Sequence, residues 1–304
     1  MYHFTRRKFL KSSSILLAAS FAVPNFDTKK DKLLLAFSTL GCPDWDLKKI
    51  TDFAVQHNYK GIELRGLQRE MDLTKAKEFN SPENIKNTLG IMQDKNLRFV
   101  DLGSSCTLHF SEPEERKKNL DEGKRFIDLA QKINCPYVRV FPNKIPEGQE
   151  KTQTLDLIAK GLQELSDYAK GGTVSVLMET HGDVVKSDDI LYVMKSAAND
   201  HAGLVWDITN MWSITKEPPE EVFPKLKKYI RHTHIKDLKL VDGKEQYAFL
   251  GKGDVPIFAA IDLLMKGGYN GYYSFEWEKL WHPEIAEPEI ALADYSKVMK
   301  QRYG

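Results

Sequence analysis

The chain has 304 residues, of which 41% are hydrophobic, and this is enough apolar material for one large globular unit. The formal net charge is only +1, and removing residues 1–22 leaves 40 basic and 43 acidic side chains. A near-neutral protein lacks the basic face that a nucleic-acid partner requires, so we expect no nucleic acid. Its cysteines, Cys42, Cys106 and Cys135, are too few and too widely spaced for a disulfide framework, and we expect them to be packing residues.

The N-terminal residues have the composition of an export signal. Arg6 and Arg7 stand in a short basic segment that is followed by an apolar run at 15–19 and by small residues. The apolar run is too short to span a bilayer, and the twin arginine is typical of twin-arginine (Tat) signal peptides. A disordered basic tail is the alternative interpretation.

This segment sets the expected domain organisation. We predict a twin-arginine signal peptide over 1–22, a linker over 23–31 and one folded domain over 32–304. The protein should therefore be exported to the periplasm. We expect no stable membrane insertion after the signal is removed, and the composition is compatible with a homo-oligomer.

Strand-like apolar segments alternate with helix-like amphipathic stretches along the folded part of the chain. Eight such units in a chain of this length predict an α/β fold, a single (β/α)8 TIM barrel. An open doubly wound sheet is the alternative, but it would normally carry a glycine-rich phosphate turn after its first strand, and residues 37–42 lack one. The eight strands are expected to begin near Leu33, Gly61, Arg98, Tyr137, Thr173, Leu204, Ile230 and Tyr272.

Four potential metal ligands stand at the ends of four successive predicted strands. Glu179, Asp207 and Glu276 each follow an apolar run, and His234 lies in the strand between the last two. The carboxyl ends of the strands form the active site of a TIM barrel, so these side chains should converge. The last interval is longer than the others because a hairpin-like insertion at 241–244 lengthens it.

Three carboxylates and one imidazole form a mostly hard-oxygen ligand set. This set suits one divalent metal ion, which could be Mn²⁺, Mg²⁺, Co²⁺ or Zn²⁺. Ligand types alone do not choose among these ions, and we favour Mn²⁺. The alternative is a metal-free salt-bridge network, which would require several nearby cations, and Lys236 is the only clear cation expected near these residues.

The strand that carries the histidine ligand turns three basic groups to one face. Side chains alternate along residues 229–237, so His232, His234 and Lys236 share one side. Burying such groups without partners costs free energy, which indicates more than packing, although a single strand histidine is most often a core residue. We assign His234 to the metal, Lys236 to the substrate, and His232, one pleat deeper, to the core.

The candidate residues lie in short segments that together carry a family resemblance: Gly61-Ile-Glu-Leu-Arg65, Val138-Arg-Val140, Leu177-Met-Glu-Thr-His181, Trp206-Asp207, His232-Thr-His-Ile-Lys-Asp237 and Ser274-Phe-Glu276. The chain resembles the xylose isomerase-like barrel superfamily in its sugar phosphate isomerase/epimerase branch. That branch also contains inosose dehydratases and ketose 3-epimerases. The C-terminal third carries the most specific part of the resemblance.

The resemblance implies that Glu179, Asp207, His234 and Glu276 hold one divalent metal ion. It also implies that the substrate is contacted by His181 and Lys236.

Three further positions are candidates for substrate contact. Glu63 and Arg139 are two of them, although Glu63 could instead be neutralised by Arg65, two residues along the same strand. Asn210 is the third. It stands where the family commonly has a histidine, and it forms hydrogen bonds but carries no proton at neutral pH.

These residues predict a divalent-metal-dependent sugar isomerase or epimerase. The metal would bind a carbonyl and a neighbouring hydroxyl and stabilise the enediolate formed when a proton leaves the adjacent carbon. Glu179 and Glu276 would remove and return that proton. Export makes a phosphosugar a poor candidate, so we expect a small-molecule carbohydrate, either a free sugar or a keto-sugar derivative.

Other functions remain open at this stage. A keto-sugar lyase or dehydratase would use the same metal site, and a non-catalytic sugar-binding barrel would use the fold alone. A related endonuclease would require more metal ligands and a basic groove, and neither is evident. The aromatic residues Trp206, Trp212, Tyr247, Trp277 and Trp281 could either stack on sugar faces or pack within the barrel and its loops.

Overall fold

A computed structural model describes residues 33–304, and the predicted signal peptide (1–22) and linker (23–31) lie outside the described residues. Within the described part, no helix combines the length and the apolar character that crossing a membrane requires. Residues 33–304 form one compact unit.

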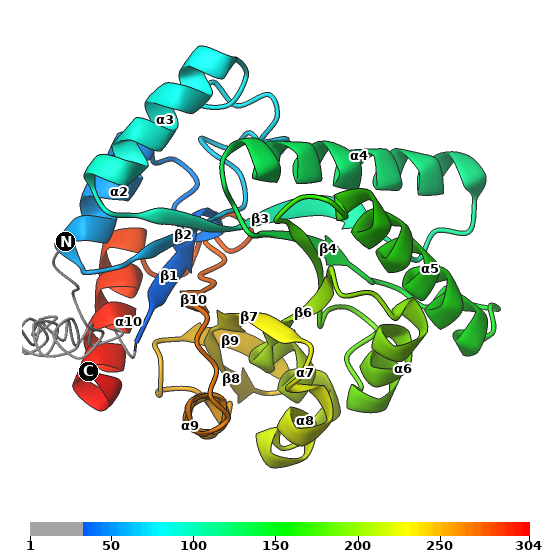
Figure 1. Cartoon of the computed structure of the whole chain (residues 1–304). Helices are drawn as coiled ribbons and strands as arrows, with labels where there is room; N and C mark the ends of the chain where they lie inside the picture. Colours follow the sequence, from blue (N-terminus) through cyan, green and yellow to red (C-terminus); the bar gives the residue numbers. More distant parts are fainter. Residues whose placement is uncertain (1–32) are drawn as a thin grey trace, which may run out of the picture. The chain divides into compact units, whose positions relative to one another are not determined.

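Eight parallel strands close into a barrel in the order β1-β10-β7-β6-β5-β4-β3-β2 (Figure 1). The closed order confirms the predicted (β/α)8 TIM barrel and excludes the open doubly wound sheet. The strands begin close to the predicted positions. Their bounds are β1 (Leu35–Ser38), β2 (Gly61–Leu64), β3 (Arg98–Thr107), β4 (Tyr137–Phe141), β5 (Ser175–Glu179), β6 (Ala202–Asp207), β7 (Ile230–Ile235) and β10 (Tyr273–Phe275).

Helices connect the strands, and Figure 1 shows them on the outside of the barrel. Their starts follow local sequence signals: Ser81 caps α3 through its side chain, and Pro82 occupies the first turn, where its missing N–H is not needed. The helices are η1 (Thr39–Gly41), α2 (Leu47–Gln56), α3 (Pro82–Asp94), α4 (Pro113–Lys132), α5 (Lys151–Ala169), α6 (Ser187–Ala197), α7 (Ile208–Thr215), α8 (Pro219–Leu226), α9 (Ile257–Lys266) and α10 (Pro288–Tyr303).

The predicted insertion after β7 is a β-hairpin formed by β8 (Asp237–Val241) and β9 (Lys244–Ala248). Its two turn residues, Asp242 and Gly243, have φ of 52° and 74°, as a tight two-residue hairpin turn requires. The Asp237 carboxylate accepts hydrogen bonds from the backbone N–H groups of Gly251 and Gly253, at 2.8 and 2.9 Å. These bonds fix the chain that returns from the hairpin beside the carboxyl end of β7.

The interior of the barrel contains a buried polar layer instead of the branched aliphatic side chains that usually fill it. Six polar side chains from the strands are almost completely buried there: Glu63, Asp101, Arg139, His232, His234 and Ser274. Burying polar groups costs free energy unless they are paired, and the contacts of Glu63, Arg139 and the two histidines determine the arrangement of the site above them. Both carboxylate oxygens of Asp101 are buried without a hydrogen-bond partner among the described residues. The three cysteines are free and buried, as predicted for packing residues.

Candidate metal centre

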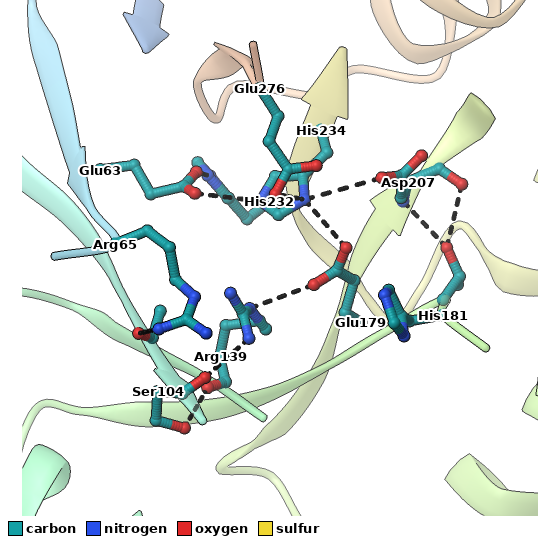
Figure 2. Close-up of polar contacts among 12 residues, drawn as sticks. Glu63, Arg65, Ser104, Arg139, Glu179, His181, Asp207, His232, His234 and Glu276 are labelled. Carbon is teal, nitrogen blue, oxygen red and sulfur yellow. Dashed lines mark hydrogen bonds and ion pairs between the residues drawn. The ribbon is translucent and has the colours of Figure 1, made fainter. Parts of the chain in front are cut away.

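The four predicted ligands converge at the carboxyl end of the barrel (Figure 2). Glu179 ends β5, Asp207 ends β6, His234 lies in β7, and Glu276 directly follows β10. These four strands are consecutive neighbours in the barrel. One ligand atom from each side chain lies within 4.8 Å of the others, and all four residues are buried.

The imidazole of His234 is the centre of this group. Its Nδ1 lies 3.2 Å from Glu179 Oε1, 3.3 Å from Glu276 Oε1 and 3.8 Å from Asp207 Oδ2. A single hydrogen on Nδ1 can serve only one of these oxygens, so acceptors outnumber donors at this point. Three carboxylate oxygens and one imidazole nitrogen are instead a suitable donor set for a divalent cation.

The charges around the four residues also favour a cation. Lys236 Nζ lies 2.8 Å from Asp207 Oδ2, 2.7 Å from Glu276 Oε2 and 2.6 Å from Glu278 Oε1. Arg139 Nε lies 3.1 Å from Glu179 Oε2. Arg139 and Lys236 therefore contact four carboxylates, counting Glu278. When His234 is neutral, as a metal-binding imidazole must be, a divalent ion would neutralise the two remaining negative charges.

Arg139 corrects one sequence-based expectation, because Lys236 is not the only cation at the site. Arg139 adds one positive charge to the metal-free salt-bridge network, but this is not enough to balance it. Even with Arg139 paired to Glu179, the described residues leave the carboxylates in excess. A buried excess of charge is costly without a counterion.

The pKa values of the three carboxyl groups are shifted in different directions. Burial alone would raise the pKa of Glu179, but the charges of His234 and Arg139 lower it overall. The pKa of Glu276 lies well below its usual value because His234 and Lys236 outweigh burial. Burial instead raises the pKa of Asp207 to about 7 despite the charge of Lys236. Glu179 and Glu276 are therefore ionised at neutral pH, as a group that accepts a proton must be.

Glu63 supports the histidine from beneath. Its Oε1 lies 3.2 Å from His234 Nε2, and its Oε2 lies 2.9 Å from His232 Nε2 and accepts a 2.8 Å hydrogen bond from Ser274 Oγ. Because Nε2 of His234 is engaged by Glu63, Nδ1 is the nitrogen left for a metal, an arrangement common for metal-binding histidines.

This placement differs from two expectations about Glu63. The residue is fully buried and does not line the cavity above the ligands, so its position does not fit substrate contact. It also does not neutralise Arg65, whose guanidinium instead donates to the Gly103 carbonyl and the Ser105 hydroxyl. His232 is fully buried, as expected for a core residue, and its role there is to hold Glu63.

A cavity of about 240 Å³ lies above the ligands, and four of the predicted substrate-contacting residues line it. His181 Nδ1 is 2.9 Å from Asn143 Oδ1, which fixes the orientation of the imidazole ring. The Asn210 backbone N–H donates to Asp207 Oδ1 at 2.8 Å, so this ligand also caps α7. The lining comprises Leu40, Arg65, Arg139, Phe141, Glu179, His181, Asn210, Lys236, Glu245, Tyr247, Glu276, Glu278, Trp281 and His282.

The aromatic residues divide between two roles. Tyr247 and Trp281 line the cavity, and Trp281 is exposed. Trp206 and Trp277 are buried and pack within the fold. Trp212 packs against Lys216, whose Nζ lies 3.8 Å from the ring centroid. Only the first two could therefore stack on a bound sugar.

The sequence interpretation assigned no role to several lining residues, among them Glu278 and Arg65. Glu278 and Arg65 each follow a recognised residue, Glu276 or Glu63, by two positions. The alternation of side chains near a strand end was a signal that could have identified both. Arg65 lines the cavity and Glu63 does not, whereas Glu276 and Glu278 both line it.

Comparisons with known proteins agree with this geometry. The profile of the xylose isomerase-like TIM barrel family matches residues 51–299. Fructoselysine 3-epimerase from Shigella flexneri is 25% identical over 167 residues, which cover 53% of this chain and 59% of the epimerase. The chain thus spans less than two thirds of the length of this curated relative.

Two solved structures share the fold. The probable 3-DHS dehydratase of Bacillus anthracis has a TM-score of 0.74 and 17% identity, with 89% of this chain and 100% of the dehydratase covered. The IOLI protein, solved with a bound zinc atom, has a TM-score of 0.74 and 19% identity, with 88% of this chain and 97% of that protein covered.

The charge excess at the site predicts specific metal binding. Chelator-treated protein should bind about one equivalent of Mn²⁺ and gain thermal stability, because a ligand that binds only the folded state stabilises it. Asp207→Asn should weaken binding by more than about 100-fold, since even outer-shell partners change metal affinity by about 10- to 100-fold. Isothermal titration measures both, with the exposed Asp167→Asn as control. Equal binding by wild type and Asp207→Asn would contradict the assignment.

The position of Glu63 predicts an effect on metal affinity without contact to the substrate. Glu63→Gln should weaken metal binding by about 10- to 100-fold, because His234 loses its charged partner at Nε2. The matched control is Glu164→Gln, which changes a surface carboxylate that pairs with Lys124. Unchanged metal affinity together with a raised KM would instead place Glu63 at the substrate.

Proposed function

The chain belongs to the xylose isomerase-like TIM barrel family, and from its candidate site we propose that it is a divalent-metal-dependent sugar isomerase or epimerase. The substrate is a free sugar or a keto-sugar derivative. The observation that carries this proposal is the convergence of Glu179, Asp207 and Glu276 on Nδ1 of His234. A divalent ion held by these four residues would polarise a carbonyl group and thereby acidify the neighbouring C–H bond.

Glu179 and Glu276 are the proposed proton-transfer groups. They come from β5 and the end of β10, which flank the two strands that carry Asp207 and His234, so they approach a bound sugar from two sides. Both have lowered pKa values and are carboxylates at neutral pH. One accepts the proton from carbon as a carboxylate. In epimerisation its partner, after taking up a proton from solvent, donates that proton to the opposite face; in isomerisation the group that accepted the proton returns it to the adjacent carbon.

Other cavity residues orient the substrate in this proposal. Lys236 and His181 line the cavity and offer nitrogen groups to sugar hydroxyls, and Asn210 adds an amide that both donates and accepts. Arg139 holds the Glu179 carboxylate through a 3.1 Å contact. A cavity of about 240 Å³ fits one monosaccharide-sized ring better than a longer oligosaccharide.

We propose Mn²⁺ as the ion, with Mg²⁺, Co²⁺ or Zn²⁺ as alternatives. Three carboxylates give the site a hard-oxygen character, and one imidazole keeps it compatible with Zn²⁺. The IOLI protein, which shares the fold, was solved with zinc. The ion that gives the greatest turnover after metal exchange identifies the active form.

A dehydratase reaction is the second candidate, because the same C–H deprotonation can be followed by loss of a neighbouring hydroxide. That step requires a proton donor at the leaving oxygen, and His181 and Lys236 both line the cavity. The Bacillus anthracis protein with the same fold is a probable dehydratase. Product analysis separates the reactions, because only the dehydratase forms a product lighter by one water.

Conservative changes at the two glutamates test the proposal. Glu179→Gln and Glu276→Gln should each lower the rate of substrate deuterium exchange in heavy water by at least about 10²-fold, the usual contribution of a general base. NMR with a panel of sugars and keto-sugars measures the exchange, and metal content is determined for each variant. Glu164→Gln is the surface control. Undiminished exchange in the Glu179→Gln, Glu276→Gln double variant would exclude both residues as the proton-transfer groups.

We also propose that the twin-arginine segment directs the protein to the periplasm. Arg6 and Arg7 lie outside the described residues, so this proposal rests on the sequence motif alone. Replacing both by lysine should retain the protein in the cytoplasm, because the paired guanidinium groups define the signal. Cell fractionation measures the distribution, and unchanged export of the Arg6→Lys, Arg7→Lys variant would contradict the assignment.

A further inference from the structure

Arg65 is a buried cation that forms no ion pair with a carboxylate among the described residues. Its side chain is 8% exposed, and among residues 33–304 no carboxylate lies within ion-pair distance of its guanidinium. The guanidinium contacts only the Gly103 carbonyl at 3.4 Å and the Ser105 hydroxyl at 3.2 Å. The nearby carboxylate of Glu122 is bound instead by the Ser105 backbone N–H. Arg65 therefore differs from Arg139 and Lys236, which both contact site carboxylates.

The backbone at Arg65 is firmly held. Its N–H donates to Thr39 Oγ1 at 2.8 Å, and the same hydroxyl donates to the Gly66 carbonyl at 2.6 Å. Gly66 has a φ of 97°, a conformation that favours glycine. The chain thus turns immediately after β2 in a fixed geometry, which sends the Arg65 side chain to the cavity rather than to the surface.

Gly103 has no side chain, and the side chains of Arg65 and Arg139 occupy the space beside it. A Cβ at this position would lie 2.7 Å from Arg65 Cδ and 2.8 Å from Arg139 Nη2, so even alanine would displace one of them. Figure 2 shows the two guanidinium groups close to each other below Glu63. Arg139 is fixed by a 2.7 Å hydrogen bond to the Ser104 carbonyl and by the Phe141 ring, 3.8 Å from its Cζ.

Placing these two cations together is unfavourable without an anion. Burial and the positive charge of Arg139 together lower the pKa of Arg65 to about 9, although the charges of Glu179, Glu122 and Glu276 act in the opposite direction. The four carboxylates around the ligand group are contacted by Arg139 and Lys236, and the buried carboxylate of Glu63 contacts His232 and His234. Arg65 forms an ion pair with none of them, and it lies on the wall of the cavity that would receive the substrate.

We propose that Arg65, together with Arg139, forms an oxyanion-binding subsite, and that the substrate is an acidic sugar derivative whose carboxylate contacts Arg65; a phosphate group offers the same chemistry, and matched probes distinguish the two. This inference rests on the proposed function, because it names the substrate class of the same site. A guanidinium offers two parallel N–H groups that match an oxyanion, and such charge-assisted bonds are the strong ones. A neutral sugar would leave Arg65 buried without a counter-charge, which costs free energy.

Matched probes test the subsite. D-Glucose, D-glucuronate and D-glucose 6-phosphate differ only at C6, and the corresponding galactose and mannose series extend the panel. Binding of each probe to the Mn²⁺-loaded full chain is measured by isothermal titration, together with solvent deuterium exchange. We expect at least one acidic probe to bind about 10- to 100-fold more tightly than its neutral counterpart, the usual effect of a charge-assisted contact. Preference for the uronate or for the phosphate identifies which oxyanion the subsite takes.

Variants of Arg65 connect this preference to the residue. Arg65→Met should remove most of the preference for the acidic probe, and Arg65→Lys should keep part of it because the charge remains without the planar fork. Arg98→Gln changes an exposed arginine at the first residue of β3 and is the control. Metal content should be unchanged in all three, because none of these side chains is a proposed ligand.

Stability separates a binding role from a structural one. Removing a buried charge that has no carboxylate partner should leave the melting temperature of Arg65→Met unchanged or raised. The proposal is overturned if no acidic probe is preferred, or if the preference survives in Arg65→Met. It is also overturned if that variant melts several degrees lower with unaltered selectivity. If the wild-type protein binds no divalent metal ion, that result would instead count against the proposed function.

Discussion

The site depends on one electrostatic constraint: three buried carboxylates meet at a single imidazole nitrogen. Nδ1 of His234 is within 3.8 Å of oxygens from Glu179, Asp207 and Glu276. Such an arrangement is strongly unfavourable unless positive charge is supplied. Lys236 and Arg139 supply part of it, and a divalent ion would supply the remainder. The requirement for a cation therefore follows from the packing of the barrel interior as well as from the types of the four residues.

The rest of the barrel holds this constraint in place. Glu63, from β2, spans the interior to contact both histidines of β7 and the Ser274 hydroxyl of β10. This contact leaves Nδ1 of His234 directed at the carboxylates, as outer-shell partners do in metal sites. Asp207 is a ligand candidate and also the N-cap of α7, so one side chain links the metal position to the start of a helix. The hairpin after β7 and its Asp237 contacts fix the chain beside Lys236.

The sequence predicts the fold and the candidate ligands because both depend on local patterns. Strand and helix periods recur along the chain, and strand-end positions identify Glu179, Asp207, His234 and Glu276. The role of Glu63 could not be predicted in this way, because it depends on which side chains meet across the barrel, and His232 is 169 residues away. The Arg139 contact with Glu179 likewise depends on the register between β4 and β5. That Arg65 forms no ion pair among the described residues is visible only when every neighbouring carboxylate is placed.

Anomalous diffraction from a Mn²⁺-soaked crystal measures the central claim directly. We expect one strong peak about 2.0–2.3 Å from Nδ1 of His234 and from one oxygen each of Glu179, Asp207 and Glu276. Lys236 should then lie beside the ion and contact Glu278. A crystal with no anomalous peak at this point, and with Lys236 Nζ still bound to Asp207 and Glu276, would contradict the metal centre and favour a closed salt-bridge network.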